Sequence, residues 1–257
     1  MHEHQQIVKQ FFDTKAVDYG AWYRLETPQG HSFLERKILV LECVGTDAGV
    51  LADVGCGPGV MSRELAEVAS TYIGIDVAPR MVEMAKTSAA HLKNVQFHVG
   101  DAKHLDLPSR YVDTLCAIGL LEYLSEPHTV LSELYRVLRP GGRLILSVPY
   151  RYSPWRVWER FIYLPLRRAS TFLVPLRQPY DLRHRSYSVL EYEKITKKLG
   201  FVLERVEFYN FALLPMPCGT LFPLVTVKAA RLGSTLKSTS LRFFGTGFVA
   251  VSLKQSG

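Results

Sequence analysis

Three glycines at alternate positions, Gly55, Gly57 and Gly59, closely follow Asp53, which lies in a short apolar segment. Glycine lets a backbone approach a ligand closely, because it has no Cβ and tolerates positive φ. The G-x-G-x-G spacing differs from the G-x-G-x-x-G of a dinucleotide-binding turn, which disfavours a pyrophosphate cradle. We therefore expect a turn between a strand and a helix that holds a small ligand, with a plain tight turn as the alternative.

Two further carboxylates follow segments with a strand pattern. Asp76 ends residues 71–76 and lies 23 residues after Asp53, where a ribose-binding acid closes a nucleoside site. Asp101 follows residues 95–99, at a strand end from which the exocyclic amine of adenine could be read. Each acid alone could be a helix cap or a turn residue. Three acids at three successive strand ends indicate one ligand-binding crevice.

The segments that must position these residues alternate between strand and helix patterns, which is typical of βαβ units. Residues 50–54 are short, apolar and favour a strand, while residues 60–69 place apolar side chains at helical spacing. The other predicted strands cover residues 71–76, 95–99 and 143–148. The other predicted helices cover residues 5–12, 32–44, 79–90 and 126–138.

These motifs resemble those of the class I S-adenosylmethionine-dependent methyltransferases, nearest to the small-molecule group that includes the ubiquinone and menaquinone biosynthesis methyltransferases. The likeness covers about residues 34–148 and is weaker in 188–208 and 243–253. It rests on five ordered motifs at residues 53–59, 74–81, 100–102, 112–123 and 138–142. The resemblance implies an α/β fold with a doubly wound, Rossmann-like, seven-stranded sheet, mostly parallel with an antiparallel last strand, and lid insertions.

The same resemblance implies the cofactor S-adenosyl-L-methionine, with S-adenosyl-L-homocysteine as its product. In that family the three glycines wrap the methionine end, Asp76 bonds the ribose hydroxyls, Asp101 with Ala102 contacts the adenine, and Asp53 orients the turn and the methionine ammonium. The expected cofactor-binding residues are Asp53, Gly55, Cys56, Gly57, Gly59, Asp76, Val77, Met81, Asp101, Ala102 and Ile118. Residues 119–123 lack the histidine that relatives often have near this strand end.

Residues 1–45 are expected to form a helical and aromatic cap ahead of the first strand. Within it, residues 12–23 are aromatic and rich in turn formers. A similar segment folds over the bound cofactor in related enzymes, which implies that Tyr19, Trp22 and Tyr23 line the substrate pocket. An edge that simply packs on the core is the alternative.

Most of the formal net charge of +7 lies in an insertion at residues 150–187, which carries eight arginines, two acids and nine aromatic residues. A helix over residues 155–166 would place Trp155, Trp158 and Phe161 on one face and Arg156 and Arg160 on the other. Such a helix suits the interface of an anionic membrane. It could instead cap the substrate pocket with solvated arginines, and nucleic-acid binding is a third alternative.

A second insertion, residues 210–238, is apolar. Residues 208–227 contain no charged side chain over 20 positions, which is near the length needed to cross a bilayer. Pro215, Pro217 and Pro223 argue against one continuous helix. We expect a hydrophobic flap over the acceptor pocket, with an ordinary buried loop as the alternative.

Few side chains qualify as catalytic groups. His184 precedes the predicted helix before the sixth strand and is the candidate general base. Tyr123 and Tyr152, at the ends of the fourth and fifth strands, are expected to bind or orient the acceptor. The arginines that could pair with a carboxylate or phosphate on the acceptor are Arg151, Arg183 and Arg185.

The composition fits a single methyltransferase domain over residues 1–257 with 47% hydrophobic residues. Its four cysteines form no C-x-x-C pair, so we expect neither a zinc site nor a disulfide framework. The first residues lack the basic and apolar regions of a secretory signal. We therefore expect a cytoplasmic protein that is peripheral to the inner face of a membrane if the basic insertion meets lipid.

The predicted function is methyl transfer to oxygen, or next to carbon, of a hydrophobic small-molecule or lipid-linked acceptor. A nucleic-acid or protein methyltransferase that uses the basic insertion is the main alternative. A nicotinamide oxidoreductase and a cofactor-binding module without catalysis are further alternatives. The sequence names neither the acceptor nor the oligomeric state.

Overall fold

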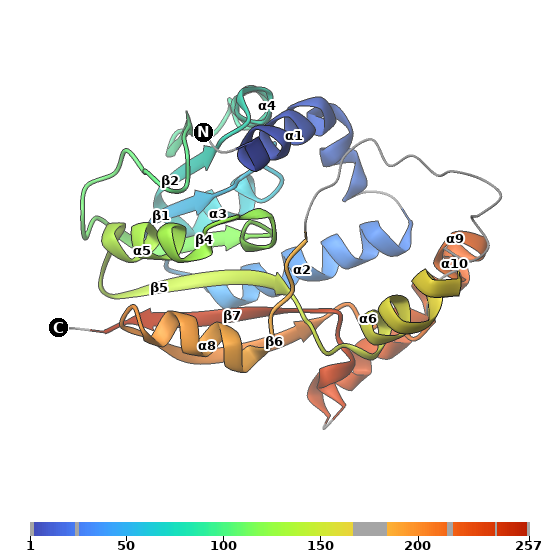
Figure 1. Ribbon diagram of the computed structural model, residues 1–257. Helices are drawn as coiled ribbons and strands as arrows, with labels where there is room; N and C mark the ends of the chain where they lie inside the picture. The colour runs from blue at the N-terminus through green and yellow to red at the C-terminus, as the bar shows by residue number, and fades with distance from the viewer. Residues whose placement is uncertain (1–2, 24–25, 167–183, 215–217, 240, 256–257) are drawn as a thin grey trace.

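The structure is a computed structural model that describes residues 3–23, 26–166, 184–214, 218–239 and 241–255. A seven-stranded sheet in the order β3-β2-β1-β4-β5-β7-β6 runs through the molecule (Figure 1). The strands are β1 Gly49–Val54, β2 Ala69–Asp76, β3 Val95–Val99, β4 Val112–Ile118, β5 Leu138–Pro149, β6 Phe201–Tyr209 and β7 Gly247–Lys254. All neighbours from β3 to β5 pair in parallel, and β7 is antiparallel to both β5 and β6. The predicted doubly wound sheet with an antiparallel last strand is confirmed.

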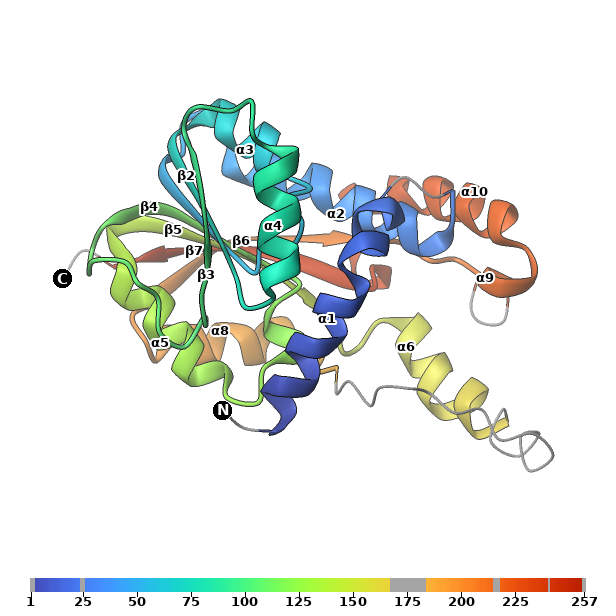
Figure 2. The same ribbon diagram turned by 90° about the horizontal axis from the view of Figure 1, so that it is seen from above.

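Helices cover both faces of this sheet (Figure 2). The α-helices are α1 Glu3–Trp22, α2 Pro28–Val44, α3 Ser62–Val68, α4 Pro79–Ser88, α5 Pro127–Val137, α6 Pro154–Trp158, α8 Val189–Lys197, α9 Cys218–Leu221 and α10 Pro223–Gly233. Short 3₁₀ segments are η1 Leu121–Tyr123, η4 Ser234–Ser238 and η5 Arg242–Phe244, and η2 Glu159–Tyr163 is a π-helix. Apolar side chains of α5 and α8 pack on one face of the sheet, and those of α2, α3 and α4 pack on the other.

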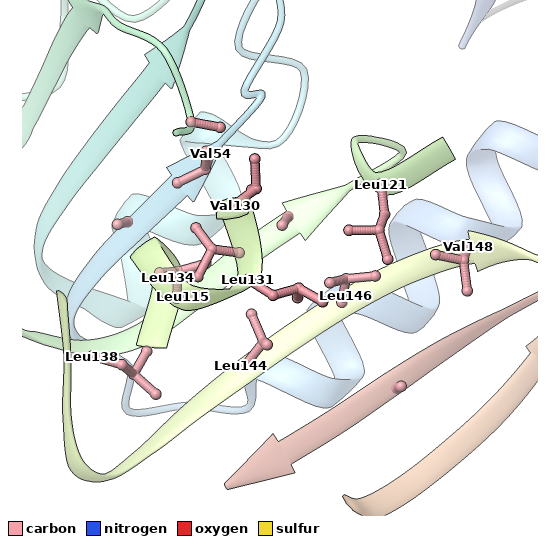
Figure 3. Close-up of a cluster of buried hydrophobic side chains, with 14 of the residues drawn as sticks. Val54, Leu115, Leu121, Val130, Leu131, Leu134, Leu138, Leu144, Leu146 and Val148 are labelled. Carbon is pink, nitrogen blue, oxygen red and sulfur yellow. The ribbon is translucent and has the colours of Figure 1, made fainter. Parts of the chain in front are cut away.

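Successive apolar side chains of a strand point to opposite faces of the sheet and so contribute to both halves of the core. In β5, Leu144 and Leu146 belong to the cluster under α5, while Ile145 between them belongs to the cluster under α2 and α3. This period of two is what a strand covered on both faces requires. Leu131 and Leu134 of α5 point at the same strands (Figure 3). The central strands are therefore held rigidly, and so are the turns at their ends.

The N-terminal segment differs from its prediction, because α1 continues to Trp22 and residues 12–22 are helical rather than rich in turns. Ala16 is fully buried against Ala78 and Met81, and Phe12 and Tyr19 pack on the same cluster. Tertiary packing of one face supports a helix that local propensity alone leaves marginal. This packing lays α1 along α4, as both views show (Figures 1 and 2).

The basic insertion also differs from its prediction, because its helix begins as α6, widens into the π-helix η2 and is α-helical again over residues 164–166. The backbone N–H of Leu164 donates to the carbonyl of Glu159, five residues back. The regular 3.6-residue period assumed for residues 155–166 therefore breaks at Glu159. Arg167 and the rest of residues 167–183 lie outside the described residues.

The apolar insertion does not form one long helix in its described part. The short helix α9 is followed by α10, which begins at Pro223 and packs on α2. No helix in the described ranges is both long and apolar enough to span a bilayer. The prediction that prolines interrupt this segment is confirmed at Pro223, whereas Pro215 and Pro217 lie outside the described residues.

Candidate functional site

A cavity opens at the carboxyl ends of β1, β2 and β4, where the strand-following turns meet. Its empty volume is about 1020 Å³, part of which is open to solvent. We call it the strand-end cavity. Its lining includes Gly55, Cys56, Gly57, Asp76, Val77, Met81, Asp101, Ala102, Ile118, Gly119 and Tyr123. Parallel strands bring such residues together because their carboxyl ends share one edge of the sheet.

The glycine turn has two distinct parts. Gly55, Gly57 and Gly59 all have positive φ, at 81°, 53° and 74°. A Cβ on Gly55 would come 3.3 Å from Leu120, and one on Gly57 would face Tyr19 at 3.9 Å, across the cavity lining. Gly59 does not line the cavity, and a Cβ there would lie 3.1 Å from the Cβ of Ala85 on α4. The lack of a side chain at Gly59 lets the turn pack on α4, and its predicted contact with the cofactor stays a prediction.

The backbone N–H groups of this turn already have acceptors. Gly55 and Cys56 both donate to the carbonyl of Ile75, at 2.7 and 3.1 Å. Gly57 donates to Asp76 Oδ2 at 2.9 Å, and Gly59 donates to the carbonyl of Cys56 at 3.2 Å. A phosphate cradle needs such N–H groups to point at the ligand. The structure thus agrees with the spacing argument against a pyrophosphate.

Asp76 lies at the end of β2 and faces the strand-end cavity. Its Oδ1 accepts a hydrogen bond from the N–H of Ala78 at 2.9 Å, and its Oδ2 accepts the one from Gly57. Burial raises the pKa of this carboxyl, and these backbone hydrogen bonds oppose the shift. An ionised carboxylate has about four acceptor positions, so Asp76 keeps capacity for hydroxyl groups of a ligand.

Asp101 also lines the cavity, and Gln5 of α1 lies within hydrogen-bond distance of its carboxylate. Gln5 Nε2 lies 3.2 and 3.0 Å from its two carboxylate oxygens, and the N–H of Lys103 donates to Oδ1 at 3.0 Å. Ala102 lines the cavity next to it. Gln5 was not predicted as a site residue.

Asp53 lies beneath the turn rather than in the cavity. Its side chain is 1% exposed, and Oδ2 accepts a hydrogen bond from the Tyr72 hydroxyl at 2.9 Å. Burial raises the pKa of the Asp53 carboxyl to about 7, the hydrogen bond opposes the shift, and the charge of Asp76 adds to it. Asp53 does not line the strand-end cavity and its carboxyl bonds Tyr72 of β2, so its role in orienting the turn and the methionine ammonium stays a prediction.

Aromatic side chains form a further part of the cavity lining. Phe12, Tyr19, Tyr23 and Tyr123 line the cavity, and the rings of Phe12 and Tyr123 meet edge to face at 5.1 Å. Trp22, which was predicted to line the pocket, instead packs on Tyr19 with 5.2 Å between ring centroids. Sequence reasoning missed Gln5, Val8 and Phe12. The signal that could have identified them is helical spacing, which places them on the same face as Tyr19. The residues of this segment that line the cavity are Gln5, Val8, Phe12, Tyr19 and Tyr23.

The predicted catalytic residues do not gather in this cavity. Of the three, Tyr123 lines it, whereas the ring of His184 packs against Tyr123 from outside at 4.8 Å. Burial lowers the pKa of His184, and the charge of Arg156 lowers it further. Tyr152 is 60% exposed and does not line the cavity, so its predicted contact with the acceptor has no support from the cavity lining and stays a prediction.

The predicted acceptor-binding arginines lie in a separate depression, which we call the α5–α8 hollow. Arg151, Arg185 and His184 line it, together with residues of the α5 N-terminus and of α8. Arg151 pairs with Glu191 and donates to the carbonyl of Ser186, and Arg185 donates to the carbonyl of Ser125 at 3.1 Å. Both arginines thus have local partners and do not line the strand-end cavity, and their contact with the acceptor stays a prediction. Arg183 lies outside the described residues.

No group of three or more His, Cys, Asp or Glu side chains within the described ranges is arranged to hold a metal ion. The cysteines Cys43, Cys56 and Cys116 are buried free thiols. Cys56 is the one among these three that lines the strand-end cavity.

Comparison with known proteins places residues 52–146 in a family described as a methyltransferase domain. Demethylmenaquinone methyltransferase of Tropheryma whipplei (strain Twist) is 27% identical over 173 residues, which are 65% of this chain and 70% of that protein. Malonyl-[acyl-carrier protein] O-methyltransferase of Serratia marcescens is 35% identical over 129 residues, 50% of this chain and 49% of that protein. The match covers 34% of an uncharacterized 37.1 kDa protein of Streptomyces fradiae, 49% of the Serratia marcescens protein and 70% of the Tropheryma whipplei protein. The chain therefore spans only part of the length of these relatives.

Among solved structures, magnesium protoporphyrin IX methyltransferase from Synechocystis PCC 6803 with bound SAH superposes with a TM-score of 0.65. The superposition covers 98% of this chain and 100% of that one, at 18% identity. At such identity the likeness supports the fold alone.

Proposed function

This chain carries a class I S-adenosylmethionine-dependent methyltransferase domain, and from that premise we propose that it methylates a hydrophobic small-molecule or lipid-linked acceptor. Oxygen is the first candidate for the accepting atom, and carbon is the second. The relatives named above as quinone and acyl-carrier methyltransferases support an acceptor of this class.

The observation that carries the proposal is that the lining of the strand-end cavity combines two kinds of groups. Asp76, Asp101 and the glycine turn supply carboxylates and closely approaching backbone. Segments of α1 and the β4 end supply aromatic and aliphatic side chains. The carboxylates suit ribose and adenine groups, while the aromatic faces suit a cation and an apolar acceptor.

The cofactor brings an already activated methyl group, so the protein mainly has to orient the acceptor and exclude water. Orientation alone is worth on the order of 7–11 kcal/mol in favourable cases. The α1 helix and its aromatic face, with Phe12 and Tyr19, provide both a cover against water and a rigid wall.

We also propose that the protein binds an anionic membrane surface with the end of the molecule that carries α6 and α10. Phe161 in η2 and Leu166 after it are 67% and 65% exposed, and Phe222 and Leu224 at the start of α10 are 60% and 58% exposed. Both segments project from the end at which the parallel strands terminate (Figures 1 and 2). Basic residues accompany them: Arg156, Arg160, Lys228, Arg231 and Arg242. Apolar and basic side chains together favour anionic lipid over a neutral surface.

The proposed acceptor class is tested by incubating the protein with methyl-labelled S-adenosylmethionine and a bacterial lipid extract, an RNA mixture or a protein mixture. We expect label to enter the organic phase with the lipid extract. Label in the precipitated RNA or protein instead would support the polymer methyltransferase alternative, and no transfer to any fraction would contradict the proposal.

His184 stays the sequence-based prediction for a general base. The variant His184→Ala tests it: methyl transfer near the parental rate, with cofactor binding intact, would exclude that role. Its place outside the cavity and behind Tyr123 favours that result.

A further inference from the structure

The lining of the strand-end cavity differs in charge from the chain as a whole. The chain contains 31 lysines and arginines against 24 acids and is basic. Among the described residues that line the cavity, Asp76 and Asp101 carry carboxylates, and none is a lysine, an arginine or a histidine. A cleft lined by one sign of charge concentrates ligands of the opposite sign. The lining therefore favours a positively charged ligand.

Aromatic rings in the same lining add to this preference. The centroid of the Phe12 ring lies 6.0 Å from that of Tyr19 and 5.1 Å from that of Tyr123, and the centroids of Tyr19 and Tyr23 are 6.2 Å apart. These neighbouring ring planes are inclined by 55° to 87°, so the rings turn faces as well as edges toward the space between them. A ring face attracts a cation that lies within about 6 Å of the centroid. Rings this close together can act on the same cation.

The surroundings of the phenols preserve this character. Burial raises the pKa of the Tyr19 hydroxyl and that of the Tyr123 hydroxyl, so both phenols stay neutral near pH 7. Arg36 is a basic side chain behind Tyr23, to whose hydroxyl its Nη2 donates a hydrogen bond at 3.3 Å, and it does not line the cavity. The buried carboxylate of Glu122 opposes the charge of this guanidinium.

The two forms of the cofactor differ in charge at sulfur. S-adenosylmethionine contains a positively charged sulfonium, and S-adenosylhomocysteine contains a neutral thioether. Methyl transfer removes the charge, because the electron pair of the broken C–S bond stays on sulfur. A cavity whose lining attracts cations therefore binds the sulfonium form more strongly than the product.

We propose that Tyr19 and Tyr123 are specificity-determining residues whose rings favour the charged sulfonium form over the neutral product. The two hydroxyls are close enough to interact electrostatically, and the Phe12 ring packs on both side chains. Tyr23 contributes less, because its hydroxyl accepts the hydrogen bond from the guanidinium of Arg36. This inference rests on the assignment of the strand-end cavity as the cofactor site. Its consequence is easier release of the product after each methyl transfer.

The test is calorimetric titration of the full chain, without an acceptor, with S-adenosylmethionine and separately with S-adenosylhomocysteine. The readout is the ratio of the two affinities, which we expect to favour S-adenosylmethionine in the wild type. Tyr19→Leu and Tyr123→Leu should each lower this ratio by roughly threefold or more, because leucine keeps an apolar contact but has no ring. Tyr19→Phe keeps the ring and should keep the ratio. The matched control is Tyr111→Leu, since Tyr111 is 42% exposed and does not line the cavity.

The inference is overturned if the wild type binds the product as tightly as S-adenosylmethionine, or if both leucine variants keep the wild-type ratio. A variant that weakens both affinities equally has only loosened the cavity, and this result in both leucine variants also counts against the inference. Where a leucine variant does not fold, methionine replaces leucine, because its flexible side chain fills irregular space. Binding of neither compound by the folded wild type would instead contradict the proposed function itself.

Discussion

Gly57 and Gly59 lie two residues apart in the turn after β1, and the structure gives them different neighbours. A side chain on Gly57 would point toward Tyr19 and the strand-end cavity, whereas one on Gly59 would meet Ala85 of α4. The spacing in the sequence indicates that both positions need glycine. It does not reveal that the two glycines have different neighbours, because this difference depends on where α4 packs.

Alanine at each position should therefore have a different main effect. Gly59→Ala should lose on the order of 1–3 kcal/mol of unfolding free energy, because it adds a contact of 3.1 Å at a positive φ. Gly57→Ala should lose less stability and weaken S-adenosylhomocysteine binding more. Urea denaturation and calorimetry on both variants measure the two effects, and equal effects of both substitutions would contradict the assignment.

Asp53 should give the protein a characteristic dependence of stability on pH. Its pKa is about 7 in the folded protein, above the value of about 4 for an unperturbed aspartate. Between these values the folded state holds a proton that the unfolded state has released, so stability falls as pH rises. Asp53→Asn should flatten this fall by roughly 1–3 kcal/mol between pH 4.5 and 7.5.

Urea denaturation of both proteins across that pH range tests the Asp53 prediction. Part of the fall should remain in the variant, because the pKa of Glu122 is also about 7. A variant whose stability falls with pH as steeply as that of the wild type would show that Asp53 does not carry the effect.

At the scale of elements, α1 shows what the sequence could and could not predict. The strands and the acids at their ends were predictable, because short apolar segments and turn residues are local signals. The length of α1 was not, since Ala16 and Phe12 are helical through contacts with Ala78 and Met81 of a distant segment.

Because α1 covers the strand-end cavity, its inner face should control cofactor retention. Phe12→Ala removes a ring that lines the cavity and packs on Tyr123. We expect weaker S-adenosylhomocysteine binding by roughly tenfold, about 1.4 kcal/mol, mainly through faster dissociation. Val17→Ala is the matched control, because Val17 is on the same helix and is 63% exposed. The measurement is the rate of S-adenosylhomocysteine dissociation from both variants in a stopped-flow instrument. Equal dissociation rates would contradict a covering role for α1.

At the scale of the whole molecule, both insertions, one with α6 and the other with α9 and α10, extend from the end of the sheet at which the parallel strands terminate (Figure 2). Each carries exposed apolar side chains, and larger exposed apolar patches mark binding sites. An acceptor dissolved in lipid could then reach the cavity without crossing water.

Vesicle binding tests this arrangement directly. The double variant Phe161→Ser with Phe222→Ser should bind phosphatidylserine-rich vesicles several-fold more weakly in sedimentation. Leu190→Ser is the control, since Leu190 lies on α8, outside both segments, and is 77% exposed. High salt should weaken wild-type binding, because the basic residues act through screened charges. Unchanged sedimentation of the double variant would contradict membrane docking by this end.

The most direct test of the whole account is calorimetric titration of the protein with S-adenosylhomocysteine, repeated with Asp76→Ala. We predict saturable binding by the wild type and at least tenfold weaker binding by the variant, because Asp76 faces the cavity and also accepts a hydrogen bond from the glycine turn. Asp106→Ala, which removes an exposed carboxylate, should bind as the wild type does. No binding by the folded wild type, or full binding by Asp76→Ala, would contradict the assignment of the strand-end cavity as the cofactor site.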